Sequence, residues 1–289
     1  MKKKSIPAFV LSALTVLCLT ACGTAASTST QTSEAAQASS AESSAASVES
    51  STAADSSKAT FTVGFDQDFP PMGFVGEDGN FTGFDLDLAA ETASRMGLEI
   101  VYQPIAWDSK DAELDAGTID CIWNGFTMNG REDNYEWSDP YLDNAQVFVV
   151  AEDSGINSTA DLAGKIVEVQ ADSSAEAALD DEANAELKAS LGSIQTTPDY
   201  NTALMDLDMG AVDAIAMDNT VADYKISTGN LALKTLDEPF ASEKYAVGFK
   251  KGNTELRDKV NEALKEMAAD GTMAEISEKW FGKDITTLK

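Results

Sequence analysis

A regular alternation of short apolar strands and amphipathic helices, which begins at Thr60, constrains the fold most. TFTVGF (60–65) and EIVYQP (99–104) have the β-branched and aromatic content of strands. FDLDLAAETASRMGL (84–98) repeats apolar residues with helical spacing. Strands that alternate with helices are typical of α/β folds. The sequence therefore predicts an α/β fold over this part of the chain.

The alternation occurs twice, which predicts two lobes. In the second series, KIVEVQ (165–170) and VDAIAM (212–217) are predicted strands, and SAEAALDDEANAELKAS (174–190) is predicted as one helix. About 230 residues of this pattern exceed one average domain. Two lobes of similar size are the natural division.

Two segments can carry the chain between the lobes, AQVFVV (145–150) and KYAVGF (244–249). We therefore predict a discontinuous first lobe, residues 60–149 and 245–289, and a second lobe, residues 150–244. Two strands that join two lobes can act as a hinge. The cleft between such lobes is where ligands usually bind.

The first 59 residues differ in composition from the rest. Three lysines precede an apolar run, Ile6–Leu19, that is too short to span a bilayer comfortably. We predict a signal peptide over 1–21 and lipidation of Cys22, because LTAC resembles the lipobox of bacterial lipoproteins. An ordinary signal peptide with an incidental cysteine is the alternative. The rest of 22–59 is rich in Ser, Thr and Ala, and we predict a disordered tether.

The charge and the residue counts exclude several classes of function. The chain has 49 Asp and Glu against 20 Lys and Arg, a formal charge of -29. Nucleic acid phosphates repel such a chain, so no nucleic-acid partner is expected. The chain has no histidine, which removes the usual general base and the commonest metal ligand, and we expect no metal or other cofactor. Once the predicted signal is removed, Cys121 is the one cysteine besides Cys22, and no intramolecular disulfide is expected.

Unusual polar and aromatic residues gather in the segments that follow the predicted strands. Loops at the carboxyl ends of strands are the favoured ligand positions in open α/β sheets. Together these loops offer an arginine, two hydroxyls at a helix start, carboxylates and aromatic faces, which complement a zwitterionic amino acid. The candidate ligand-binding residues are Asp66, Phe69, Trp107, Asn124, Gly125, Phe126, Thr127, Arg131, Ser173, Ser174 and Asp218.

The polar candidates suit the two charged groups of an amino acid. Arg131 can hold a carboxylate through two parallel hydrogen bonds, and Thr127 can donate another. Ser173 and Ser174 open a predicted helix whose free amides can cap the same carboxylate. Asp218 can pair with the ammonium group, helped by the backbone carbonyl of the glycine at 125.

The aromatic candidates suit the ligand's side chain. Phe69, Trp107 and Phe126 are predicted to form its walls, with Asp66 and Asn124 as polar contacts. Aromatic residues are usually buried in any case. Core packing is therefore the alternative for Phe69 and Trp107.

The polar candidates have structural alternatives too. Arg131 is an ordinary surface charge in the simplest alternative, although the other two arginines fall on predicted polar faces of helices. Ser173, Ser174 and Asp218 stand where N-caps of helices are expected.

A series of motifs resembles the polar amino-acid-binding proteins of ATP-binding-cassette importers, solute-binding family 3. GFDLDLA, WSDPYLDNAQVFVV, DLAGKIVEVQ, GAVDAIAMD and DGTMAEISEKWFG occur in the family's order across 60–282. The resemblance implies a type II periplasmic-binding-protein-like fold, with a two-strand hinge and a ligand cleft. It also implies Arg131 for the carboxylate, Asp218 for the ammonium group, and Asp66, Phe69 and Trp107 around the side chain.

Two departures from the family pattern concern the predicted site. FTMNGR has one residue fewer before its arginine than the family pattern, which bears on Thr127 and Arg131. Asp172 stands where the family commonly has glycine before its two hydroxyl residues. A carboxylate there repels a bound carboxylate unless it points away.

The predicted function is capture of a free amino acid outside the cytoplasm and delivery to a membrane permease. The protein is expected to act as a monomer on the outer face of the cell membrane, held there by its lipid. A carboxylate-dependent dehydratase of cyclic acids and a sensory module that acts through a partner are the alternatives. The ligand stays open among cationic, polar neutral and cystine-like amino acids.

Overall fold

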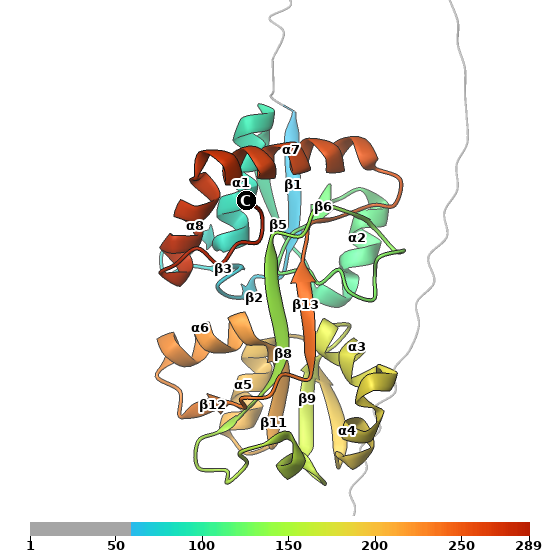
Figure 1. Cartoon of the computed structure of the whole chain (residues 1–289), viewed down its shortest axis with the longest axis vertical. Coiled ribbons are helices and arrows are strands. Elements are labelled where there is room, and N and C mark those ends of the chain that lie inside the picture. Colours follow the sequence, from blue (N-terminus) through green and yellow to red (C-terminus); the bar gives the residue numbers. More distant parts are fainter. Residues whose placement is uncertain (1–58) are drawn as a thin grey trace, which may run out of the picture. The chain divides into compact units, whose positions relative to one another are not determined.

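The computed structural model describes residues 59–289, which form two α/β lobes (Figure 1). The predicted signal peptide, lipidated Cys22 and tether fall on residues 1–58, outside the described residues, apart from Ala59. Within residues 59–289, no helix has the length and apolar content needed to cross a bilayer.

The first lobe is built on a five-stranded sheet with the order β5-β1-β6-β14-β7. β1 is parallel to β5 and β6, whereas β14 is antiparallel to β6 and β7. A small antiparallel sheet, β2-β3-β4, follows β1. The strands are β1 (Thr60–Phe65), β2 (Asp68–Phe69), β3 (Gly73–Val75), β4 (Phe81–Thr82), β5 (Glu99–Pro104), β6 (Cys121–Ile122), β7 (Glu136–Trp137) and β14 (Gly248–Phe249).

Helices cover this first sheet. α1 begins with acidic residues in its first turn, carries Arg95 in its last turn, and ends at Gly97, which adopts φ 71°. This charge order suits the helix dipole, and glycine suits the left-handed cap. α7 buries Val260, Leu264 and Met267 on one face. The helices are α1 (Phe84–Met96), a 3₁₀ turn η1 (Trp107–Ser109), α2 (Lys110–Ala116), α7 (Thr254–Asp270) and α8 (Thr272–Phe281).

The second lobe is built on a sheet with the order β10-β9-β11-β8-β12, in which β13 also pairs with β8. β10, β9 and β11 are parallel, and β8 is antiparallel to its neighbours. The strands are β8 (Leu142–Ala151), β9 (Ile166–Gln170), β10 (Ser193–Thr197), β11 (Ala214–Asp218), β12 (Leu233–Thr235) and β13 (Ala241–Tyr245). The helices are η2 (Thr159–Leu162), α3 (Ser174–Asp180), η3 (Glu182–Asn184), α4 (Ala185–Ser190), α5 (Tyr200–Asp208) and α6 (Asn219–Gly229).

The segment predicted as one helix over 174–190 is three short helices instead, so that prediction was wrong. Asp181 has extended backbone angles, and its side chain accepts a hydrogen bond from Ala183 N. A side chain that bonds the nearby backbone competes with the helical ladder. The helix therefore stops before Asp181 and restarts after it.

β8 and β13 run side by side between the lobes and form the hinge (Figure 1). β8 starts at Leu142, which bridges to Thr286 near the C-terminus, and ends at Ala151, which pairs with Leu233 of β12. The pairing places residues 146–149 in the second sheet with β11, although the sequence analysis assigned them to the first lobe. The crossing therefore begins earlier in the chain than predicted.

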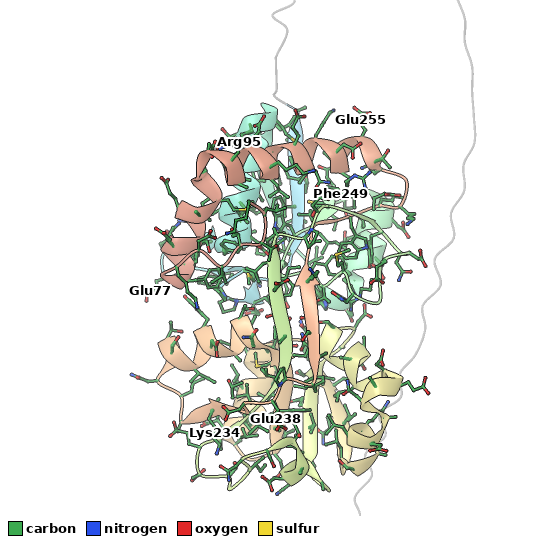
Figure 2. The ribbon with its side chains drawn as sticks, viewed as in Figure 1. Glu77, Arg95, Lys234, Glu238, Phe249 and Glu255 are labelled. Carbon is green, nitrogen blue, oxygen red and sulfur yellow. The ribbon has the colours of Figure 1, made fainter. Side chains whose placement is uncertain are left out.

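Apolar cores fill both lobes. One buried cluster includes Phe61, Phe84 and Phe249 of the first lobe and continues along β8 to Val147 and Val149. Phe249 of β14 lies within the first lobe in the side-chain view (Figure 2). A second cluster fills the other face of the second sheet. The lobes are thus joined through packed side chains as well as through the hinge strands.

Candidate functional site

Asp66 and Asn124 meet where two neighbouring strands of the first sheet end. Asp66 follows β1, Asn124 follows β6, and the two strands are parallel neighbours. The Asp66 amide donates a hydrogen bond of 3.0 Å to Asn124 Oδ1. Both side chains are buried, and Asn124 Nδ2 has no hydrogen-bond partner within residues 59–289. The structure therefore brings these two predicted residues together.

The loop after β6 is fixed by Gly125 and Asp85. Gly125 has a left-handed φ of 57°, and a Cβ there would lie 2.9 Å from Phe69 Cε1 and 3.0 Å from Tyr245 Cε2. Only glycine fits both the angle and the space. The Gly125 amide donates to Asp85 Oδ2, and Asp85 Oδ1 accepts a hydrogen bond from the Tyr141 hydroxyl at 2.8 Å. Asp85 thus positions the loop without facing the second lobe.

The predicted aromatic residues divide between the cleft and the core. The Phe69 ring lies 5.9 Å from the ring of Tyr200, which belongs to α5 of the second lobe. Trp107 meets Phe126 edge-on at 5.5 Å. Phe126 is fully buried in an aromatic cluster with Tyr135. Phe69 therefore faces the other lobe, whereas Phe126 packs inside its own.

Arg131 lies at the cleft, beside Thr127. Its guanidinium donates to Thr127 O at 3.4 Å and, across the lobes, to Asp172 O at 3.2 Å. The other arginines, Arg95 and Arg257, are paired with carboxylates, whereas Arg131 has no ion-pair partner among the described residues. Thr127 Oγ1 is buried and, in the same part of the chain, has no hydrogen-bond partner. The charge of Arg131 is therefore not neutralised by a described carboxylate, and a hydroxyl without a hydrogen-bond partner belongs to the same loop.

Ser173 and Ser174 stand at the start of α3 in the second lobe. Ser173 Oγ accepts from Glu176 N at 3.1 Å and therefore caps α3, as its structural alternative predicts. Ser174 Oγ accepts from Gln146 Nε2 at 3.0 Å. Ser174 lines the same cavity as Arg131. The two hydroxyls thus differ: one is used by its own helix, and the other opens toward the cleft.

Asp218 ends β11 and points into a buried polar cluster. Its Oδ1 accepts hydrogen bonds from Asn144 Nδ2 at 2.8 Å and from the Tyr245 hydroxyl at 2.6 Å. Although Asp218 precedes α6, its side chain makes no capping hydrogen bond. Asp218 is therefore the N-cap residue of α6 by position, but its side chain is used by the buried polar cluster instead.

Hydrogen bonds between side chains hold the two lobes together. Gln170 Nε2, at the end of β9, donates to Asp66 Oδ2 at 2.7 Å. Asn201 Nδ2, on α5, donates to Asp68 Oδ1 at 2.6 Å. Each bond joins a residue near β1 to a residue of the second lobe. The lobes are therefore in contact across the cleft.

A buried lysine makes a further inter-lobe contact. Lys110 is 1% exposed, and its Nζ pairs with the carboxylate of Asp172 and lies 5.3 Å from the centre of the Trp107 ring. Asp172 has a left-handed φ of 58°, and its amide donates to Glu176 Oε2. Asp172, the departure from the family pattern, thus directs its carboxylate toward Lys110.

The carboxyl groups around the cleft are hard to ionise. Burial raises the pKa of Asp66 to about 6. Burial, followed by the charge and contact of Glu243, raises the pKa of Asp218 well above its ordinary value. The pKa of the Tyr200 hydroxyl is also raised, first by burial and then by the charge of Asp218. A cation placed among these groups is therefore strongly favoured.

A cavity of about 330 Å³ lies between the loop after β6, α3 and β13. It carries Arg131 from the first lobe, Ser174 from the second and Glu243 from the hinge. Its lining residues are Thr127, Asn129, Gly130, Arg131, Ser174, Ala177, Ala178, Asp181, Ala183, Asn184, Phe240, Ala241, Ser242 and Glu243. The described residues include no group of three or more acidic or cysteine side chains arranged to hold a metal ion.

Sequence reasoning missed Lys110, Gln170, Tyr200 and Glu243, all of which lie at the cleft or hinge. Gln170 ends a strand, so the rule that found Asp66 also applies to it. Glu243 is buried between exposed Ser242 and Lys244 on β13, an alternation that the sequence does not show because all three residues are polar. Lys110 and Tyr200 are brought to the site only by tertiary packing, for which the sequence has no local signal.

The chain matches one known family over nearly all of the described residues. The family model of the bacterial extracellular solute-binding proteins, family 3, matches residues 61–283. The chain belongs to this family. The predicted family is thereby confirmed.

Several named proteins are similar to this chain over most of their length. The L-cystine-binding protein TcyJ of Escherichia coli strain K12 is 34% identical over 79% of this chain and 85% of its own. The L-cystine-binding protein TcyA of Bacillus subtilis strain 168 is 33% identical over 81% of this chain and 85% of its own. A solved substrate-binding protein of an ABC uptake transporter from Streptococcus pneumoniae, with bound histidine, is 38% identical.

That solved structure superposes on this family 3 chain with a TM-score of 0.76, over 79% of this chain and 94% of the other. The predicted fold class, a type II periplasmic-binding-protein-like fold of two α/β lobes, is confirmed. The two proteins from Escherichia coli and Bacillus subtilis are named for binding L-cystine, and the solved protein is named for binding a substrate.

Proposed function

We propose that this protein captures an amino acid between its two lobes and delivers it to an ABC importer. The observation that carries the proposal is the separation of charges across the cleft. Arg131 and the unpartnered Thr127 hydroxyl suit a carboxylate, and the buried Asp218 suits an ammonium group. The similar proteins are named as binding proteins, which supports capture rather than catalysis.

L-Cystine is the first ligand to test. Two similar proteins are named for cystine, and a third was solved with bound histidine. Asp66, Asp218 and Glu243 are buried near the cleft. Among the described cations there, Arg131 is directed toward the cleft, and Lys110 is paired with Asp172. Cystine has two ammonium and two carboxylate groups and is neutral overall, so the names of the similar proteins, and not the excess of acids, make it the first ligand to test.

Closure of the lobes couples binding to delivery. A ligand that contacts Arg131 of one lobe and Asp218 of the other gains both contacts only when the lobes are together. Such a ligand shifts the population toward the closed arrangement. The Gln170–Asp66 and Lys110–Asp172 contacts add to the same state.

The proposed location is the outer face of the cell membrane, with the monomer held by a lipid on Cys22 and its tether. A diacyl anchor is sufficient for stable attachment. In cells, we expect the wild-type chain in the membrane fraction and Cys22→Ala released from it. Equal membrane association of both chains would argue against lipidation of Cys22.

Thermal-shift screening with the twenty amino acids and cystine tests the function. A ligand at 100 times its dissociation constant adds about 2.7 kcal/mol of stability, which is readily detected as a rise in Tm. Asp218→Asn is expected to remove the rise, whereas Asp258→Asn, on the exposed face of α7, is expected to keep it. The proposal fails if no amino acid raises the Tm of the wild-type protein.

A further inference from the structure

Glu243 forms a buried carboxyl pair with Asp218. Asn144 Nδ2 donates to Asp218 Oδ1 at 2.8 Å and to Glu243 Oε1 at 2.6 Å, so the two carboxyl groups share one amide. Gln146 Nε2 donates to Glu243 Oε1 at 2.7 Å. Asp218 is 3% exposed and Glu243 is 6% exposed. Neither has an ion-pair partner among the ion pairs of residues 59–289.

The groups around the pair supply little positive charge. Tyr245 donates to Asp218 from β13, and Tyr200 approaches from α5. Asp66 acts on the same Tyr200 hydroxyl from the end of β1. Arg131 and Asp181 line the cavity that Glu243 also lines, and Arg131 is the one cation of that cavity. The pair therefore lies in a predominantly acidic environment.

The pair does not depend on contact between the lobes. Asp218, Asn144 and Glu243 belong to β11, β8 and β13, which are strands of one sheet. The inter-lobe contacts of Asp66 and Lys110 are separate from it. The same carboxyl pair is therefore present before and after a ligand closes the cleft.

We propose that Glu243 is a further ligand-binding residue, and that the Asp218–Glu243 pair holds one proton which the ammonium group of the ligand displaces. This inference rests on the proposed function and adds that ligand binding releases one proton. Two neighbouring buried carboxyl groups cannot both ionise without a large cost, so they share a proton, as coupled acids do. An ammonium group placed beside them supplies the missing positive charge.

The charge balances in this exchange. Without ligand, the pair carries one proton and one negative charge. The bound ammonium group adds one positive charge, and the displaced proton leaves for the solvent, so the buried charge is unchanged. Burial and Glu243 both raise the pKa of Asp218, which is the direction this exchange requires. Gln146 Oε1, buried and without a hydrogen-bond partner within the described chain, is a further acceptor near Glu243.

Calorimetry in buffers of different ionisation enthalpy measures the released proton. L-Cystine and L-arginine are titrated into the protein at pH 7.0 in phosphate and in Tris. Asp66, whose pKa is about 6, is largely ionised at this pH and adds little to the release. The wild type is expected to release about one proton per ligand, and Glu243→Gln is expected to release almost none.

Glu168→Gln is the matched control. Glu168 is also a buried acid of the second lobe, with a pKa raised by burial and by Asp206, but it does not line the cavity. This variant is expected to release as many protons as the wild type. The inference is overturned if the wild type binds ligand without releasing a proton, a result that does not depend on the folding of any variant. It is also overturned if Glu243→Gln releases as many protons as the wild type. Failure of cystine and all twenty amino acids to bind overturns the proposed function instead.

Discussion

Replacing Asp66 by Asn is expected to stabilise the ligand-free protein at neutral pH. Asp66 is 6% exposed, and burial is the main cause that raises its pKa from the ordinary 3.8 to about 6. A shift of one pKa unit corresponds to ~1.4 kcal/mol, so the shift from 3.8 to about 6 means that ionised Asp66 destabilises the folded protein by about 3 kcal/mol. Asparagine keeps the shape and one acceptor oxygen but carries no charge.

The size of this effect changes with pH in a defined way, while its sign stays the same. Below 3.8 the carboxyl group is protonated in the folded and the unfolded protein, and no cost arises. Between pH 3.8 and about 6 the unfolded chain ionises this group while the folded protein keeps it protonated, so the relative stability of the wild type falls over this range and is constant above it. The advantage of Asp66→Asn is therefore near zero at pH 3.5 and reaches its full value above pH 6.5.

Urea unfolding at pH 3.5, 5 and 7.5 measures this difference. Asp213→Asn is a control of opposite sign, because hydrogen bonds from Ile166 N and Lys165 lower the pKa of Asp213. This control is expected to lose stability at pH 7.5. An Asp66→Asn protein that is no more stable than the wild type at pH 7.5, or equally more stable at pH 3.5, would refute the reasoning.

Two further predictions concern the contacts around the cleft. Lys110→Met removes the charge that pairs with Asp172 across the lobes, and we expect ligand to dissociate several-fold faster in stopped-flow experiments; an unchanged rate contradicts a role in closure. Gly125→Ala places a Cβ against Phe69 and Tyr245 at a left-handed φ, and we expect a loss of a few kcal/mol in unfolding free energy by urea titration. Gly97→Ala, which meets no atom within 4 Å, is the control for the backbone angle alone.

The sequence predicted the elements whose signals are local. The helix predicted over 84–98 has its apolar face, acidic start and glycine end within one segment, and the structure has it over Phe84–Met96. The single helix over 174–190 was wrong because Asp181 bonds the backbone locally and breaks it. Periodicity alone does not register such a competing side chain.

The candidate site was found in part for a similar reason. The rule that ligands bind at the carboxyl ends of strands was sufficient to predict Asp66, Asn124 and Asp218 as candidates, because each follows a predicted strand. Glu243 is placed beside Asp218 by a hydrogen bond from Asn144, which lies on another strand and is distant in the sequence. Contacts of this kind depend on strand order and register, which one sequence does not reveal.

A thermodynamic cycle between Arg131 and the ligand carboxylate tests amino-acid capture most directly. Calorimetry measures the cognate amino acid and its decarboxylated amine against the wild type and Arg131→Ala. Loss of either partner leaves the other unpaired, and we expect each single change to cost about 3 to 5 kcal/mol, with little further loss when both are made. Losses that simply add would contradict the assignment of Arg131 to the carboxylate.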